Sequence, residues 1–466
     1  MLIPAKENVW PMYLFSFFIF HFQYYRYLCR MKRIFLSITF CLAALLSVQA
    51  QTYTPSADNM EARRAFEGFR FGIFIHWGIY SEFAQGEWYL NSGLSHEEYS
   101  KVASCFYPIL FNAQEWVSAI KDSGAKYITF TSRHHDGFSM FHTRQSKYNI
   151  VDATPFGRDV LKELSEACAA QGVKLHLYYS ILDWMRPDYP LGRTGLHTRS
   201  TLRPNYDSYF RFMEAQVQEL LTRYAPIGAL WFDGYWDHDG DSIPFDWRMP
   251  EFYEYIHRLQ PSCLIGNNHH ITPITGEDFQ MFERDLPGEN TAGLSGQEIS
   301  HLPLEMCQTM NGMWGYKVAD QNYKSSTELI RLIARAAAKG SNLLLNIGPQ
   351  PNGQLPATAL DRLKDIGQWM RVNGESIYET SATQIPEQPW GVTTKRQGRL
   401  FLHVFDAETT SITVPWTGKA PKTARALADG SQLAVVSSKK GKSQELQIQL
   451  PASRSTADYV VELALR

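Results

Sequence analysis

The chain has 466 residues, of which 44% are hydrophobic and 20% charged, so it is long enough to bury a large core in more than one domain. Its formal net charge is −2, and it contains no polybasic run. This composition argues against a nucleic-acid partner and against binding to a membrane surface.

The N-terminal segment has the three parts of a secretory signal peptide. Met31-Lys32-Arg33 is charged, residues 34–48 are apolar, and Val48-Gln49-Ala50 offers small residues for cleavage. We therefore predict an upstream extension and signal peptide over residues 1–50, with the signal proper at 31–50. The alternative is a transmembrane anchor, but four basic side chains interrupt the apolar stretches. We expect a periplasmic or secreted protein with no stable membrane insertion after signal cleavage.

The cysteines give no sign of a metal site. Four of the six follow the predicted signal, and they are widely spaced, without a CxxC pair or a His-Cys cluster. Export permits disulfides, but a domain of this size does not need them. We expect mostly buried free thiols at Cys105, Cys168, Cys263 and Cys307.

Short apolar runs alternate with helical patterns from about residue 63 to residue 372. The predicted strands are 71–76, 127–131, 173–180, 227–233, 263–265 and 342–347, and the predicted helices are 114–123, 160–170, 209–224, 251–259, 326–339 and 360–372. Such alternation implies parallel strands with crossover helices, and its length predicts a (β/α)₈ barrel over residues 51–380. No helix is recognisable soon after residue 265, so we expect an irregular barrel there.

The pattern changes near residue 381. Runs at 400–405, 411–414, 433–436 and 445–448 alternate with Gly, Lys and Pro turns. This spacing predicts an antiparallel β-sandwich domain over residues 381–466.

Asp233 stands at the end of the most informative strand. The run ending in Leu230-Trp231-Phe232-Asp233-Gly234 is bounded by Pro226 and Gly234, which is typical of a fully buried strand. A carboxylate among aromatic rings at such a strand end favours sugar chemistry, because aromatic faces stack on sugar rings and a carboxylate can attack an anomeric carbon. The plainer alternative is a helix N-cap. The high aromatic content of the chain, 14%, also fits a carbohydrate-binding cleft.

Other predicted strand ends carry a matching set of polar and aromatic residues. They are His76, Glu87-Trp88, Arg133-His134-His135, Tyr178-Tyr179 and Trp231. In a barrel, functional groups lie at the C-terminal ends of strands. Adjacent histidines point to opposite sides of a strand, and neither H-x-H nor HExxH is present, so we favour hydrogen bonds to sugar hydroxyls over metal binding.

With these residues in view, the chain resembles the retaining α-L-fucosidases of glycoside hydrolase family 29. The resemblance rests on an ordered series of motifs: FGIFIHWGIYS, GEWYLNSG, KYITFTSRHHDGFSMF, GRDVLKEL, LYYSILDW, ALWFDGYWD, LPLEMC, NGMWGY and NLLLNIGPQPNGQLP. It implies a (β/α)₈ catalytic domain followed by a β-sandwich, with no cofactor or metal. It also implies Asp233 as nucleophile and places substrate-binding residues at His76, Glu87, Trp88, His134, His135, Tyr179, Trp231 and Trp314.

The acid/base partner has two main candidates. Retaining hydrolysis needs a second carboxyl about 5–5.5 Å from the nucleophile, and the resemblance implies a variable loop after the nucleophile strand. Glu283 is flanked by aromatic residues that could raise its pKa by desolvation, and it is our first choice. Glu305 matches a family motif more closely, but that motif has the pattern of a barrel strand. Where several family members have an Arg, this chain has His269-His270.

The sequence thus predicts an exo-acting α-L-fucosidase that releases terminal fucose from oligosaccharides or glycoconjugates. One alternative is a related exo-glycosidase for a fucose-like sugar such as α-L-galactose. Another is a non-catalytic fucose-binding barrel, which the presence of Asp233 and several loop carboxylates disfavours.

Overall fold

The computed structural model describes residues 53–195, 203–224, 226–421, 423–440, 443–455 and 457–465. The chain divides into two compact units, Met1–Thr54 and Pro55–Arg466, and the account below concerns the second. The predicted signal peptide and upstream extension lie outside the described residues. No helix in the described ranges is long and apolar enough to span a membrane.

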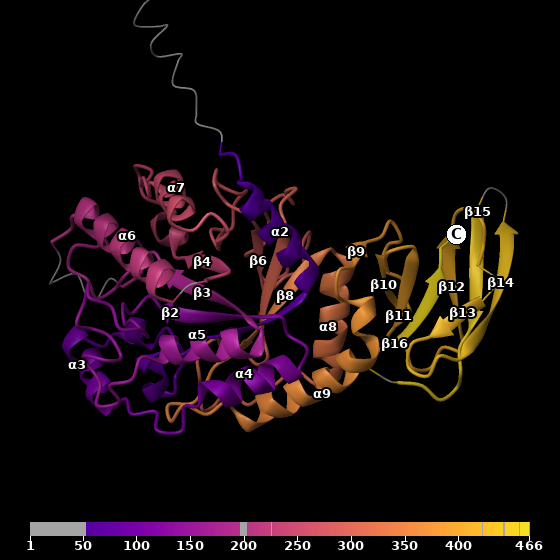
Figure 1. Ribbon diagram of the computed structural model, residues 1–466, viewed down its shortest axis with the longest axis horizontal. Helices are drawn as coiled ribbons and strands as arrows, with labels where there is room; N and C mark the ends of the chain where they lie inside the picture. Colours follow the sequence, from indigo (N-terminus) through magenta and orange to yellow (C-terminus); the bar gives the residue numbers. More distant parts are fainter. Residues whose placement is uncertain are drawn as a thin grey trace, which may run out of the picture. The chain divides into compact units, whose positions relative to one another are not determined.

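Eight parallel strands form the first sheet, in the order β5-β4-β3-β2-β1-β8-β7-β6 (Figure 1). Their bounds are β1 Phe71–Ile75, β2 Tyr127–Arg133, β3 Lys174–Ser180, β4 Ala229–Asp233, β5 Leu264–Asn267, β6 Gln280–Glu283, β7 Leu304–Thr309 and β8 Ser341–Ile347. Between β5 and β6 a backbone hydrogen bond from Asp278 N to Ile265 O, 2.7 Å, draws the two edges together. The result is a nearly closed barrel, which confirms the predicted fold class.

Helices cover the outside of the barrel (Figure 1). Their bounds are α2 Ala57–Phe69, α3 His96–Ser100, α4 Ala113–Asp122, α5 Val160–Gln171, α6 Tyr206–Arg223, α7 Met249–Leu259, α8 Ser326–Ala338 and α9 Ala357–Asn373, with short 3₁₀ helices at Ile79–Phe83, Tyr89–Ser92, Lys101–Cys105, Tyr235–His238 and Gly374–Ser376. Between α7 and α8, where every residue is described, there is no helix, so the predicted irregularity is confirmed.

Local sequence signals set the ends of these helices. Ser325 and Glu328 form a reciprocal capping box at the start of α8, and Asp159 caps α5. Gly172 ends α5 with a φ of 72°, a conformation that glycine adopts without strain. The strands that feed the site are almost wholly buried, which explains their continuous apolar runs.

The second sheet has eight strands in the order β12-β15-β14-β13-β16-β11-β10-β9, and neighbouring strands pair antiparallel. Their bounds are β9 Ser381–Ala382, β10 Gly391–Arg396, β11 Arg399–Val404, β12 Ser411–Trp416, β13 Thr423–Ala426, β14 Gln432–Lys440, β15 Ser443–Gln449 and β16 Tyr459–Ala464. Apolar side chains from both ends of this sheet share one core, as in the predicted sandwich. The indole of Trp369 in α9 donates to the carbonyl of Asp458, the residue before β16, and so joins this domain to the barrel domain.

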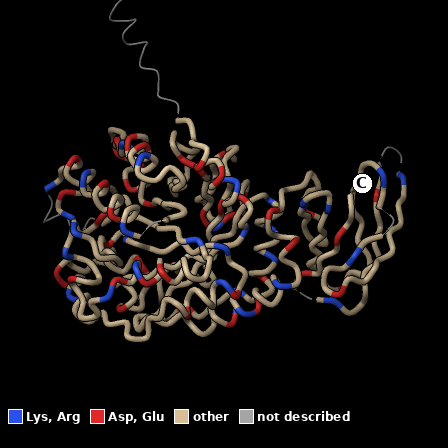
Figure 2. Tube along the Cα trace, viewed as in Figure 1, with Lys and Arg blue, Asp and Glu red and all other residues tan. Residues whose placement is uncertain are grey.

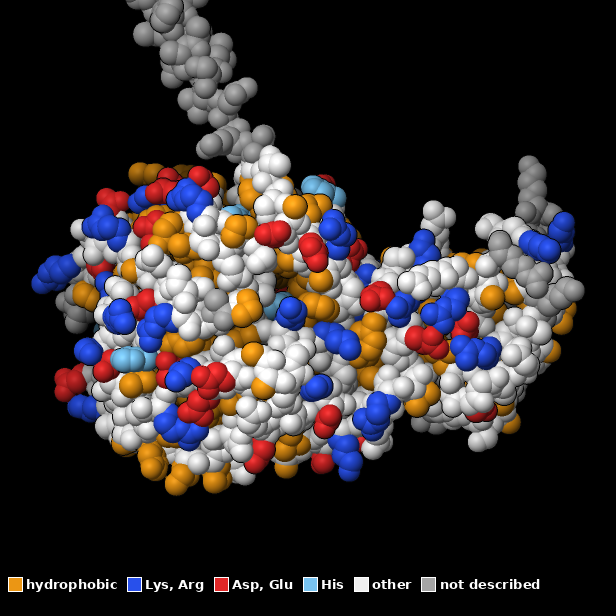
Figure 3. Space-filling model, viewed as in Figure 1, with side chains coloured by type: hydrophobic (Ala, Val, Ile, Leu, Met, Phe, Trp, Pro, Cys, Tyr) orange, Lys and Arg blue, Asp and Glu red, His pale blue; other side chains and the backbone are white. Residues whose placement is uncertain are grey.

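Positively and negatively charged residues are interspersed along the described chain (Figure 2). On the face in Figure 3 they are interspersed and form no single-sign patch. This distribution gives no electrostatic footprint for a nucleic acid on that face. Of the four cysteines in the described ranges, all are free thiols, and only Cys105 is exposed.

Candidate active site

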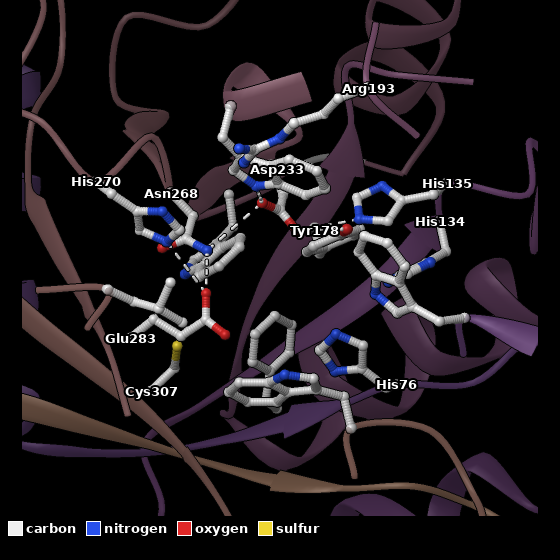
Figure 4. A pocket seen from close by; sticks show the side chains of 16 residues that line it. His76, His134, His135, Tyr178, Arg193, Asp233, Asn268, His270, Glu283 and Cys307 are labelled. Atoms are coloured by element: carbon white, nitrogen blue, oxygen red, sulfur yellow. Dashed lines mark hydrogen bonds and ion pairs between the residues drawn. The ribbon is translucent and has the colours of Figure 1, made fainter. Parts of the chain in front are cut away.

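A cavity of about 240 Å³ lies where the barrel strands end (Figure 4). Pockets for drug-sized ligands are roughly 300–1,000 Å³, so this one suits a single sugar ring better than a chain of sugars. Its lining combines aromatic rings, imidazoles and two carboxylates. The lining residues are Phe74, His76, Trp88, His134, His135, Tyr178, Arg193, Trp231, Asp233, Trp236, Asn268, His270, Glu283, Leu294, Cys307 and Trp314.

Asp233 is the last residue of β4, and its carboxylate is held by four donors. Oδ1 accepts from Gly234 N at 2.8 Å, from Trp236 Nε1 at 3.0 Å and from Asn268 Nδ2 at 3.5 Å. Oδ2 accepts from the Tyr178 hydroxyl at 3.0 Å. Gly234 has a φ of 103°, a conformation rare for other residues, and it turns the chain so that its N–H and the Trp236 indole reach back to the carboxylate.

Glu283 lies across the cavity, as the last residue of β6 rather than on a loop. Its Oε2 accepts from Asn268 Nδ2 at 2.8 Å and lies 3.2 Å from His270 Nε2. The Asn268 amide therefore stands between the two carboxylates, as Figure 4 shows. The carboxylate oxygens that it joins, Oδ1 of Asp233 and Oε2 of Glu283, can be no farther apart than the sum of its two hydrogen-bond lengths.

The two carboxyls have opposite pKa shifts. Burial raises the pKa of Asp233 to about 6, and the charge on Glu283 adds to this. Burial also acts to raise the pKa of Glu283, but hydrogen bonds from His270 and Asn268 outweigh it and hold that pKa below the ordinary value. Because each charge disfavours the other, the pair retains one proton more readily than two isolated carboxyls would.

Three imidazoles gather on the side of the cavity away from Glu283: His76, His134 and His135 (Figure 4). Burial lowers the pKa of all three, to about 3 for His76, so they are neutral near pH 7. The predicted divergence of His134 and His135 is wrong: both line the cavity, because they follow the end of β2 instead of lying within the strand.

Tyr179 does not reach the cavity, and its predicted contact with the sugar is not supported by the geometry. Its hydroxyl donates to Gln216 and accepts from Arg133 outside the barrel wall. The preceding residue, Tyr178, points inward, since side chains alternate along a strand. The tyrosine that lines the cavity and donates to Asp233 is thus Tyr178.

Two predicted carboxylates also lie outside the cavity lining. Glu87 is buried and accepts a hydrogen bond from the Gly315 backbone N–H at 2.7 Å. Glu305 lies in the barrel interior, where it accepts from the Trp231 indole at 2.9 Å and from the Tyr127 hydroxyl at 2.6 Å. Burial raises the pKa of Glu305 to about 7. Its position suits support of the Trp231 ring better than contact with a ligand.

The remaining predicted binding residues, Trp88, Trp231 and Trp314, all line the cavity. Trp88 stacks on Trp236, with ring centroids 5.7 Å apart. The sequence singled out His270 only as part of the pair His269-His270, and several other lining residues were missed, the most important being Asn268 after β5. The only signal for Asn268 was its place directly after the strand β5.

Comparisons with known proteins agree on one family. A family model described as α-L-fucosidase matches residues 41–375. An α-L-fucosidase of Dictyostelium discoideum is 30% identical over 404 residues, which are 79% of this chain and 84% of that protein. The solved structure of α-L-fucosidase isoenzyme 1 from Paenibacillus thiaminolyticus has a TM-score of 0.77 and 33% identity, covering 88% of this chain and all of that one. The Thermotoga maritima α-fucosidase in complex with fucose has a TM-score of 0.71 and 26% identity, covering 89% of this chain and all of that one.

Proposed function

The chain belongs to the α-L-fucosidase family, and from that premise we propose that it hydrolyses terminal α-L-fucosides by double displacement, with Asp233 as nucleophile and Glu283 as acid/base. The substrates would be fucosylated oligosaccharides or glycoconjugates. The size of the cavity supports removal of one terminal sugar at a time.

The single observation that carries the proposal is the Asn268 amide between two carboxylates. Its nitrogen is 3.5 Å from Asp233 Oδ1 and 2.8 Å from Glu283 Oε2. The oxygens so joined must be closer than the roughly 6.5–9.5 Å that separates the carboxyls of inverting enzymes, which need room for a water. The spacing therefore supports a retaining mechanism.

The proposed roles follow from how each carboxyl is held. Asp233 is fixed by donors from Gly234, Trp236 and Tyr178, so its charge and orientation are ready for attack on the anomeric carbon. In the free site the pair's proton favours Asp233, because the pKa of Asp233 is raised and that of Glu283 is lowered. In the reactive form that proton must be on Glu283 instead, which gives it to the departing glycosidic oxygen. Glu283 then takes a proton from the water that releases fucose from Asp233.

Hydrolysis of an aryl α-L-fucoside by the purified protein tests the proposal. We expect release of the aryl group with α-L-fucose as the first-formed product. Hydrolysis of the α-L-galactoside and no hydrolysis of the fucoside would favour the related exo-glycosidase. Binding of fucose without turnover of either substrate would favour the non-catalytic barrel.

The pH profile gives a sharper expectation. Because the pKa of Asp233 is raised to about 6, kcat/KM on an activated aryl fucoside should fall as the pH drops below about 6, where the nucleophile becomes protonated. In Glu283→Gln the repelling charge is gone, so this acidic limb should move to lower pH. Glu305→Gln is the control, because Glu305 has a pKa of about 7 but does not line the cavity. The roles assigned to Asp233 and Glu283 would be contradicted if the acidic limb of the pH profile shifted in Glu305→Gln but not in Glu283→Gln.

We also propose that the protein is exported to the periplasm or beyond and is cleaved after Ala50. The support is the order of charged, apolar and small residues from Met31. N-terminal sequencing of protein isolated from its native host should begin at Gln51. An intact Met1 in a membrane fraction would instead identify an anchor.

A further inference from the structure

His135 is held by a hydrogen-bond chain whose direction can be determined. Its Nδ1 lies 2.7 Å from Ser180 Oγ, and Ser180 Oγ lies 2.7 Å from the Leu182 carbonyl oxygen. A carbonyl oxygen only accepts, and a serine hydroxyl has one proton, so that proton must go to Leu182. Ser180 Oγ can then only accept from His135. It follows that Nδ1 carries the ring hydrogen.

The Asn346 side-chain amide fixes the hydrogen of His76 on Nδ1 in a similar way. Its Nδ1 lies 2.7 Å from Asn346 Oδ1, while Asn346 Nδ2 donates to the Trp314 carbonyl at 2.7 Å. The Trp314 oxygen fixes which end of the amide is the nitrogen, because the reverse placement would set two acceptors against each other. The amide oxygen therefore faces His76, whose Nδ1 must be the donor.

Both rings are neutral, as the lowered pKa values indicate, so a hydrogen on Nδ1 leaves Nε2 as a bare acceptor. Nε2 of His135 lies 3.5 Å from Asp233 Oδ2. Neither atom carries a hydrogen that it could donate to the other. A hydroxyl group of a ligand could therefore donate its hydrogen to either of them. Both rings belong to the cavity wall opposite Glu283 (Figure 4).

We propose that His76 and His135 recognise the sugar as hydrogen-bond acceptors, and that Asn346 and Ser180 are positioning residues that fix this direction. The hydroxyls they contact must then donate, so the site selects against groups that cannot, such as fluorine or an ether oxygen. The inference rests on the proposed function only in that a fucosyl unit occupies the cavity.

The Ser180 chain also protects the nucleophile. In the opposite tautomer, His135 Nε2–H would donate to Asp233 Oδ2 and stabilise its charge before attack. With the hydrogen held on Nδ1, the only hydrogen-bond donor to Oδ2 among the described residues is the Tyr178 hydroxyl. Removal of Ser180 should therefore weaken attack as well as sugar binding.

The first test uses the unaltered protein and calorimetric binding of L-fucose and its 3-deoxy, 3-deoxy-3-fluoro, 4-deoxy and 4-deoxy-4-fluoro analogues. Fluorine accepts weakly but cannot donate a hydrogen bond. At a position where removal of the hydroxyl raises Kd about tenfold or more, we expect the fluoro analogue to bind less than twofold tighter than the deoxy analogue. The inference would be overturned if the fluoro analogue bound nearly as tightly as L-fucose. It would also be overturned if neither deoxy analogue bound more weakly than L-fucose.

The second test compares Ser180→Ala with Ser180→Thr, which keeps the hydroxyl, and with Ser132→Ala. Ser132 is a matched control, because its buried hydroxyl donates to the Tyr178 backbone carbonyl and not to an imidazole. In Ser180→Ala the His135 hydrogen is free to move to Nε2, so the fluoro analogue at one position should bind at least fivefold tighter than the deoxy analogue. In Ser180→Thr and Ser132→Ala, the fluoro and deoxy analogues should bind with the same relative affinities as in the unaltered protein.

Identical patterns in Ser180→Ala and Ser132→Ala would contradict the role of Ser180. Thermal unfolding of each variant checks the fold, and the wild-type comparison holds even if a variant is unstable. Hydrolysis of an aryl fucoside is measured on the same preparation. Turnover combined with recovery of affinity by fluorine would reject only the hydrogen-bond direction, whereas absence of turnover would reject the proposed function.

Discussion

Asp233→Gly should lower kcat on an activated aryl fucoside by about four to six orders of magnitude while leaving the fold intact. The change removes the group that would form the covalent bond to fucose. Added azide should restore part of the activity and give β-L-fucosyl azide, because a small anion fits the space left on the attacking face. Product analysis by NMR distinguishes the β-azide from the α-azide.

The matched control is Asp233→Leu, which also lacks the carboxylate but fills the space. Azide should not rescue it. Thermal unfolding should show both variants folded, since the lost carboxylate is buried beside the charge on Glu283 and its removal relieves repulsion. Substantial turnover by Asp233→Gly without azide would remove Asp233 from the nucleophile role.

The barrel could be predicted because its strands are buried on both faces and so appear as continuous apolar runs. The strands β1, β2, β3, β4 and β8 have this pattern, and the positions just after them identify the cavity wall. The strand β6, Gln280–Glu283, has four residues and no flanking helix, so no periodicity distinguishes it from a loop. For that reason the sequence predicted Glu283 as the acid/base but not the strand that positions it.

The error at Tyr179 has a different cause. Two adjacent tyrosines at a strand end are equivalent in composition, and only the register of the sheet separates them. Tyr178 pairs with Trp231 and Ser180 pairs with Asp233, so these residues share the inward face, and Tyr179 lies on the outer one. Counting alternate residues back from Asp233 across the register would have found Tyr178, but a single sequence does not give that register.

The site as a whole shows a similar division. Residue types that sugar chemistry requires, such as carboxylates and tryptophans at strand ends, could be recognised from the sequence. The partners that fix their direction could not, because Asn346 and Ser180 are ordinary polar residues within strands. Their role depends on which atoms their own second hydrogen bonds reach.

Glu283→Ala should separate the acid from the other candidate, Glu305. Loss of the acid affects poor leaving groups far more than good ones, because a good leaving group departs without protonation. We expect kcat/KM to fall by about 10²–10⁴-fold on a natural fucoside and by much less on an activated aryl fucoside. Azide should attack the fucosyl-enzyme and give α-L-fucosyl azide, of opposite anomeric form to the product of Asp233→Gly.

The companion variant is Glu305→Ala, which removes the acceptor for the Trp231 indole and the Tyr127 hydroxyl. Its losses should be similar for good and poor leaving groups, because a displaced Trp231 ring disturbs the sugar and not the departing oxygen. Glu305→Gln retains an acceptor for the indole and should recover most of the activity. Since Trp231 stacks on Tyr178, which donates to Asp233, part of the loss should appear in kcat. If leaving-group dependence and the α-azide appear in Glu305→Ala instead, the proton donor is Glu305, and Glu283 serves only to hold Asn268 and His270.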